Sequence, residues 1–165
     1  EQFGDVAGRK LAYIGDGNNV AVSLLAACAH FGMDFAVATP EGYELPVEAI
    51  LDANDAAREH NIKIETFTDP AAAAFEADVI YTDTWVSMGQ EEEAKQRLQT
   101  FEKYQVNADL LSKAKATAIV LHCLPAHRGQ EITDEVADGP QSRIFAQAEN
   151  RLHAQKAILV NLLAH

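Results

Sequence analysis

Short apolar runs of strand length alternate with helix-length segments along this chain, and that alternation constrains its fold more than any other feature. The runs with the length and composition of strands are residues 11–14, 35–38, 62–67, 79–82 and 118–121. Strands that alternate with helices predict a parallel sheet with helices on both faces, a doubly wound α/β fold. We therefore expect a single domain over residues 1–165 with a Rossmann-like sheet in the order 3-2-1-4-5, the 62–67 strand lying near an edge.

Local signals place helices between these strands. Residues 20–31 are almost wholly apolar, so a helix there must be covered on most sides. Pro46 suits the first turn of a helix that extends to residue 60, and Asp69 followed by Pro70 marks the start of another. Further helices are expected over residues 90–104, 108–114 and 147–163.

The expected C-terminal helix is long and carries apolar residues on several sides. Leu152, Leu159 and Leu163 form one stripe, and other apolar residues lie on the remaining faces. The sheet of this domain can cover only one side of such a helix. The helix is then expected either to fray after about Lys156 or to pack against another copy of the chain.

The composition limits the partners and the compartment. With 25 acidic against 13 basic residues the net charge is −12, which argues against nucleic acid and against anionic membrane surfaces. No apolar run approaches the roughly 18 residues of a membrane span. Cys28 and Cys123 lie in unlike contexts, so no disulfide framework is predicted and we expect a cytoplasmic protein. The chain begins at Glu1 without a starting Met, and we expect it to be a fragment.

Polar side chains follow strands one, four and five of the predicted sheet. In doubly wound sheets, ligands bind beyond the carboxyl ends of the strands, near the point where the strand order reverses. The order 3-2-1-4-5 makes these three strands neighbours, so their polar ends are expected to meet in one crevice. The segments are Gly15-Asp16-Gly17-Asn18-Asn19, Asp83-Thr84-Trp85-Val86-Ser87-Met88-Gly89 and His122-Cys123-Leu124-Pro125-Ala126-His127-Arg128-Gly129.

The first of these segments is similar to a dinucleotide-binding fingerprint, but Val20 stands where close helix packing requires glycine. A Rossmann-type oxidoreductase is therefore a weak alternative. The plainer interpretation is that Asp16, Asn18 and Asn19 form a polar turn that caps the next helix.

The other two segments leave several kinds of chemistry open. Asp83 can cap a turn or pair with a lysine, or its carboxylate can hold a substrate ammonium group in a partly desolvated site. Cys123 with a nearby histidine fits a buried thiol, a nucleophile with its base, or a metal site. The spacing from Cys123 to His127 does not match a regular zinc pattern, and no fourth ligand lies nearby.

These motifs, together with Ala148-Glu149-Asn150-Arg151, closely resemble the second domain of ornithine carbamoyltransferases, over essentially the whole chain. The Ser-Met-Gly loop and the His-Cys-Leu-Pro motif are typical of the ornithine branch, and the continuation from His127 to Asp134 is similar to the bacterial anabolic type. That family's first domain carries a Ser-x-Arg-Thr-Arg loop and a His-Pro-x-Gln segment. Neither occurs here, so we expect the carbamoyl-phosphate-binding first domain and the homotrimer-forming surface to be absent.

The resemblance implies the reaction in which the δ-amine of L-ornithine attacks carbamoyl phosphate to give L-citrulline and phosphate, without cofactor or metal. It implies that Asn19 meets the α-carboxylate of ornithine and Asp83 the α-ammonium group. Ser87 and Met88 are implied to complete the site around this head group.

It further implies that Cys123 and the Leu124 carbonyl lie beside the δ-amine and the carbamoyl group, so that Cys123 and Asp83 are the catalytic residues. Arg151 is implied to reach carbamoyl phosphate. With half the site missing, the isolated chain is expected to be inactive. The alternatives are a non-catalytic amino-acid-binding module and a carbamoyltransferase for a related amine such as putrescine.

Overall fold

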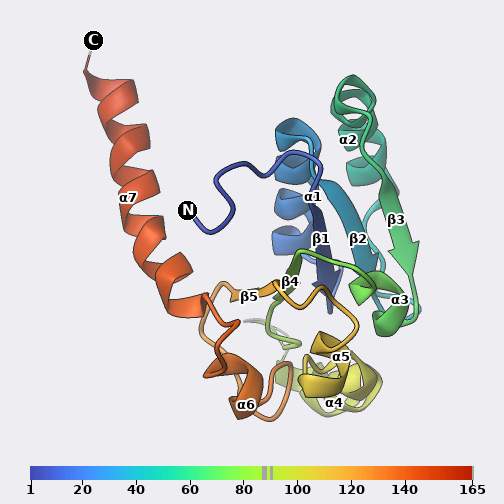
Figure 1. Ribbon diagram of the computed structural model, residues 1–165. Coiled ribbons are helices and arrows are strands. Elements are labelled where there is room, and N and C mark those ends of the chain that lie inside the picture. The colour runs from blue at the N-terminus through green and yellow to red at the C-terminus, as the bar shows by residue number, and fades with distance from the viewer. Residues whose placement is uncertain (87–88, 90, 165) are drawn as a thin grey trace.

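The computed structural model describes residues 1–86, 89 and 91–164, and its centre is a parallel sheet of five strands (Figure 1). These strands are β1 (Lys10–Ile14), β2 (Asp34–Ala38), β3 (Ile64–Phe67), β4 (Val79–Thr82) and β5 (Ile119–His122). Their order is β3-β2-β1-β4-β5, and every neighbouring pair is parallel. The predicted fold class, strand order and edge position of the third strand are confirmed.

Successive residues of each strand enter different cores, because side chains alternate between the two faces of a sheet. Ile14 and Ile80 belong to one buried cluster, whereas Tyr13 and Tyr81 belong to the other. A sheet buried on both faces explains why its strands appear as continuous apolar runs in the sequence.

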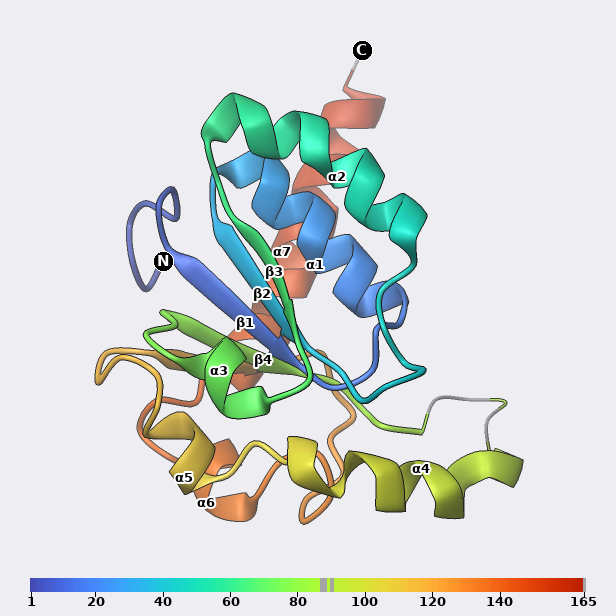
Figure 2. The same cartoon turned by 90° about the vertical axis from the view of Figure 1, so that its right-hand side faces the viewer.

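Helices cover both faces (Figure 2). On one face lie α1 (Asn19–Phe31) and α2 (Val47–His60), and on the other lie α3 (Pro70–Ala74), α4 (Ala94–Phe101), α5 (Ala108–Leu111) and α6 (Asp134–Ala137). Short 3-10 turns at Glu91–Glu93 and Glu102–Tyr104 flank α4, so the helix expected over residues 90–104 is broken into three pieces. The sequence did not predict α6, because one helical turn is too short to show a periodic apolar pattern.

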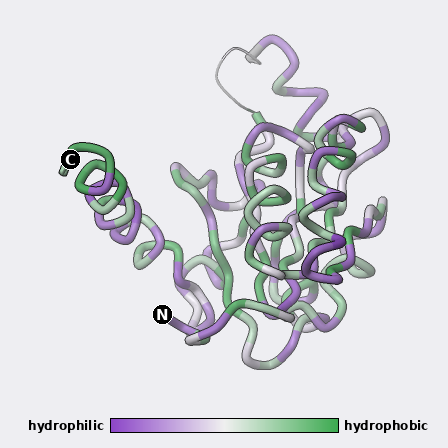
Figure 3. The backbone as a smooth tube through the Cα atoms, turned by 90° about the horizontal axis from the view of Figure 1, so that it is seen from above, coloured by the Kyte–Doolittle hydropathy of each residue, from purple (hydrophilic) through white to green (hydrophobic). Residues whose placement is uncertain are grey.

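The last helix, α7 (Ile144–Leu163), begins three residues before the predicted start at residue 147 and then leaves the body of the domain (Figures 1 and 3). Ile144 is buried, but every residue from Arg151 to Ala164 is exposed. The sheet does not cover the stripe of Leu152, Leu159 and Leu163, since these residues are 58%, 55% and 77% exposed. The start of α7 contacts the sheet near its β5 edge, where Gln147 is hydrogen-bonded to His122 and Tyr81.

The helix does not end near Lys156 but continues to Leu163. Packing against another copy therefore stays a prediction. In the part of the chain that the structure describes, no helix is both long and apolar enough to cross a membrane.

Candidate functional site

The end of β1 reaches toward the end of β4 through Asn18. The side-chain oxygen of Asn18 caps α1 by accepting hydrogen bonds from the backbone N–H groups of Val20 and Ala21, at 2.9 and 3.1 Å. Its amide nitrogen donates to Asp83 Oδ2 at 3.0 Å. The predicted polar cap is therefore confirmed for Asn18, while Asn19 is the first residue of α1 and is exposed.

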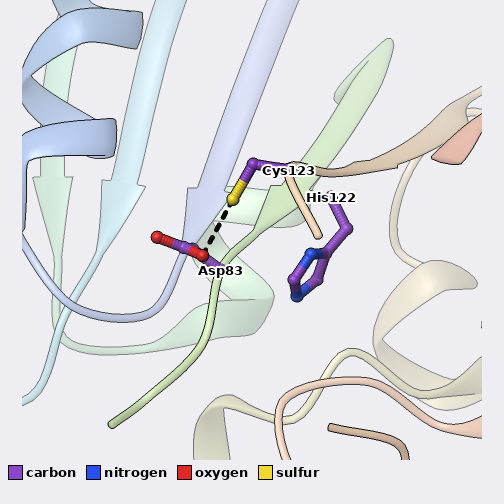
Figure 4. Close-up of side chains that lie close together, drawn as sticks. All are labelled: Asp83, His122 and Cys123. Carbon is purple, nitrogen blue, oxygen red and sulfur yellow. Dashed lines mark hydrogen bonds between the residues drawn. The ribbon is translucent and has the colours of Figure 1, made fainter. Parts of the chain in front are cut away.

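Asp83 and Cys123 are joined directly, from the ends of β4 and β5 (Figure 4). The thiol of Cys123 donates to Asp83 Oδ1 at 2.9 Å, and the Thr84 N–H donates to the same oxygen at 2.8 Å. Asp83 is only 8% exposed. The ends of β1, β4 and β5 therefore meet at one carboxylate, as the predicted strand order requires.

This environment keeps Cys123 protonated. Burial, together with the hydrogen bond to Asp83 and its negative charge, raises the pKa of the Cys123 thiol to about 12. Reactive cysteines need the opposite, a pKa lowered toward neutrality by positive charge or a helix N-terminus. The geometry favours a thiol that positions a ligand over a thiolate that attacks one.

Gln147, which was not among the predicted site residues, connects α7 to this cluster. Its Nε2 donates to the Tyr81 hydroxyl at 2.9 Å, and its Oε1 accepts from the His122 N–H at 3.0 Å. Burial raises the pKa of the Tyr81 hydroxyl well above its usual range, and the nearby Cys123 contributes to this shift. The only available signal was the spacing from Arg151, one helical turn later on the same face.

An open groove of about 520 Å³ between α1 and α7 is lined by three of the predicted site residues, Asn19, Cys123 and Arg151. Arg151 is exposed at its rim. Leu124 is partly buried and has a backbone φ of +58°. The predicted ligand-binding residues Ser87 and Met88 lie outside the described residues.

Among the described residues, Asp83, His122 and Cys123 are close enough together to be considered as a metal site. Their potential ligand atoms lie within 4.8 Å of one another. Their hydrogen bonds do not fit that role. The Nδ1 of His122 accepts from the Leu124 N–H at 2.9 Å, and its Nε2 faces Glu131 Oε1 at 3.1 Å. A metal would need a free imidazole lone pair, whereas both ring nitrogens of His122 are engaged by other groups.

A buried cation fixes the loops around the site. Arg97 of α4 is 3% exposed, forms an ion pair with Asp16, and donates from Nε to the Trp85 carbonyl at 2.6 Å. Its guanidinium also lies over the rings of Tyr43 and Phe101, 4.8 and 5.2 Å from their centroids. Burial raises the pKa of Asp16, and the Arg97 charge opposes this shift. Arg97 thereby links α4 to the loops that follow β1, β2 and β4.

A doubly wound sheet with an acidic, thiol-containing cluster at the ends of β1, β4 and β5 is typical of an α/β domain that binds a small molecule at the carboxyl ends of its strands. The profile of the family "Aspartate/ornithine carbamoyltransferase, Asp/Orn binding domain" matches residues 7–162, and the chain belongs to this family.

Several relatives of high similarity are ornithine carbamoyltransferases. That of Gloeobacter violaceus is 58% identical over 99% of this chain and 52% of its own length. That of Caldicellulosiruptor saccharolyticus is 54% identical over 97% of this chain and 52% of its own length. The solved structure from Pyrococcus furiosus has a TM-score of 0.91 at 53% identity, covering 95% of this chain and 50% of that one. The chain thus spans about half the length of the relatives it matches.

Proposed function

We propose that this chain is the ornithine-binding half of an ornithine carbamoyltransferase, which transfers the carbamoyl group of carbamoyl phosphate to the δ-amine of L-ornithine. The products are L-citrulline and phosphate. The observation that carries the proposal is the meeting of Asn18, Asp83 and Cys123 at one carboxylate, beside a groove that Arg151 borders.

Asp83 is suited to hold the α-ammonium group of ornithine. Its described partners are the Asn18 amide, the Cys123 thiol and the Thr84 N–H, all of which are neutral. A buried carboxylate without a cation among these partners favours a positively charged ligand, and pairing is strengthened where water is excluded. Asn19 at the groove is assigned to the α-carboxylate, with Ser87 and Met88 completing the head-group site.

The reaction then needs no covalent intermediate. The δ-amine attacks the carbamoyl carbon directly, with Cys123 and the Leu124 carbonyl beside it. Orientation and charge stabilisation supply the catalysis. A protonated thiol fits this positioning role, and the Arg151 guanidinium suits the phosphate of carbamoyl phosphate.

The remaining partners belong to the same proposal. A first domain that binds most of carbamoyl phosphate completes the site, and the whole enzyme forms a homotrimer in the cytoplasm. The continuation His127-Arg128-Gly129-x-Glu131 supports the bacterial anabolic type.

Activity assays of this chain alone, and of the chain fused behind the first domain of the Gloeobacter violaceus relative, test the proposal. We expect no citrulline from the chain alone and turnover from the fusion, with inhibition by norvaline, which has no δ-amine. Citrulline formation by the chain alone would refute the half-site argument. A fusion that folds and binds ornithine without turnover would indicate a binding module, and a preference for putrescine would indicate a related carbamoyltransferase.

A further inference from the structure

The loop after β5 closes on a buried carboxylate that the proposed reaction does not use. Glu131 and His122 are both 0% exposed. Glu131 Oε1 lies 3.1 Å from His122 Nε2 and accepts from the His127 N–H at 2.5 Å. The Glu131 carboxylate therefore connects the start of this loop, at His122, with its middle, at His127.

The hydrogen bonds of His122 determine where its proton resides. The Leu124 N–H can only donate, so Nδ1 of His122, 2.9 Å away, must carry a lone pair. The proton of the neutral ring is then on Nε2, where it points at Glu131 Oε1. The other tautomer would set a ring N–H against the Leu124 N–H and a lone pair against the carboxylate. Glu131 thus selects the tautomer that lets His122 hold Leu124.

Leu124 needs such a restraint because its backbone is in the left-handed region, with φ of +58°. Residues with a Cβ rarely adopt this conformation unless surrounding contacts impose it. The Leu124 N–H bond to His122 is one such contact, and it fixes the peptide between Cys123 and Leu124.

Hydrogen bonds to neighbouring segments hold the backbone of Glu131 and of the two residues before it. The backbone carbonyl of Glu131 accepts from the Val106 N–H at 2.8 Å, and Val106 is bridged to Ile132. The Gln105 side chain donates to the carbonyls of Gly129 and Gln130, at 3.0 and 2.9 Å. A series of hydrogen bonds from Glu131 to His122 and from His122 to Leu124 therefore connects an anchored segment to the backbone beside Cys123.

We propose that Glu131 is a positioning residue: by holding His122 in its Nε2–H tautomer, it fixes the Cys123–Leu124 backbone at which the amine attacks carbamoyl phosphate. This role rests on the proposed function for its catalytic consequence. The tautomer and the restraint on Leu124 belong to this chain alone, so they can be measured whether or not the proposed reaction is correct.

The direct test is nitrogen-15 NMR of the His122 ring in the full 165-residue chain, with hydrogen exchange of the Leu124 amide. The wild-type ring should show Nδ1 unprotonated and Nε2 protonated, with a slowly exchanging Leu124 N–H. Glu131→Leu should shift the ring toward a mixture of tautomers and speed exchange at Leu124. A wild-type ring with the proton on Nδ1 would overturn the proposal, even if the leucine variant does not fold.

Kinetics of the fusion enzyme add the functional readout. Glu131→Leu should lower kcat/KM for ornithine by at least about 10-fold, as loss of a group that orients a site residue does. Glu131→Gln keeps an oxygen facing Nε2 and should stay within about 3-fold of wild type, the expected size of a modest hydrogen-bond change.

Thr133→Val is the matched control, because it removes a buried hydroxyl that has no hydrogen-bond partner among the described residues. It should leave both the ring tautomer and the kinetics unchanged. A loss of activity in Glu131→Leu with an unchanged His122 tautomer, or an equal loss in Thr133→Val, would show that Glu131 acts only on stability.

Discussion

The suitability of Asp83 for binding a cation depends on its hydrogen-bond partners being neutral. Among the described residues, this mostly buried carboxylate accepts from an amide, a thiol and a backbone N–H, and none of these groups carries a positive charge. The sequence predicted its meeting with Cys123, because both residues end neighbouring strands. It did not predict the Asn18 contact, since a capping asparagine commits its oxygen to α1 while tertiary packing directs its amide.

Asp83→Asn in the fusion enzyme should weaken ornithine binding far more than carbamoyl phosphate binding. It keeps the shape and removes the charge that pairs with the ammonium group, a loss of about 3–5 kcal/mol for a buried pair. Calorimetric titration with each substrate measures the difference. Asp78→Asn, at the opposite end of β4, is the control: Asp78 pairs with Arg9 and Lys115, so its loss should lower stability and spare binding. Equal losses for both substrates in Asp83→Asn would make Asp83 structural.

Cys123 should impose a pH dependence on stability rather than on chemistry near neutrality. Its folded pKa of about 12 lies above the ordinary 9.0, so the folded state retains the proton that the unfolded state releases. The stability contributed by the protonated thiol is present below about pH 9 and is lost as the pH rises toward 12. Urea unfolding of wild type and Cys123→Ser at pH 8 and about pH 10.5 should show a smaller alkaline loss in the variant.

Cys28 provides the comparison, because burial raises its pKa to about 12 as well and it lies away from the cluster. Cys28→Ala should also flatten the alkaline loss, but only Cys123→Ser should change kcat, and that change should be partial. An acylated Cys123 trapped during turnover of the fusion enzyme would refute direct attack by the amine.

At the scale of elements, the strands were predictable and the contacts between loops were not. Each strand is a short apolar run bounded by polar residues, which the sequence displays locally. Arg97 looks like any other charged residue of α4, and its burial arises because Asp16, Trp85 and Tyr43 come from three separate loops. Such a site appears only once the sheet has brought the loops together.

Replacing Arg97 with methionine should destabilise the chain by about 3–5 kcal/mol, because it leaves the carboxylate of Asp16 buried without its partner. Adding Asp16→Asn should restore part of that loss, which a double-mutant cycle in urea measures. The exposed pair of Arg58 and Asp55, with side chains 81% and 92% exposed, is the control. Arg58→Met should change stability by less than about 1 kcal/mol. Similar losses of stability in Arg97→Met and Arg58→Met would mean that the buried ion pair contributes no more than an exposed one.

In the molecule as a whole, α7 is a helix whose apolar side chains the rest of the domain leaves largely uncovered. The sequence pattern predicted that α7 needs cover on several sides, and in the structure every residue from Arg151 to Ala164 is exposed. The direction in which the helix leaves β5 is set by its first turns, through Ile144 and Gln147, and no local pattern encodes that direction. The result is a set of exposed apolar side chains from the middle of α7 to its end: Leu152, Ile158, Leu159, Val160, Leu162 and Leu163.

An apolar surface of this kind tends to find a partner, so the isolated chain should self-associate through α7. Sedimentation velocity at rising concentration should show dimers or larger species for wild type. Leu159→Glu with Leu163→Glu should keep the chain monomeric and folded, because glutamate is a good helix former and both positions are exposed. Leu51→Glu on α2, which is 61% exposed but lies away from α7, should leave the association unchanged.

Hydrogen exchange then distinguishes a covered helix from a fraying one. In the associated wild type, amides up to about Leu163 should be protected, whereas in the monomeric glutamate variant protection should fade beyond about Lys156, since an isolated helical extension is marginal in water. In the fusion enzyme, the first domain should supply the cover instead, and α7 should be protected without any dependence on concentration. A wild-type chain that stays monomeric with α7 protected throughout would show that the helix needs no second surface.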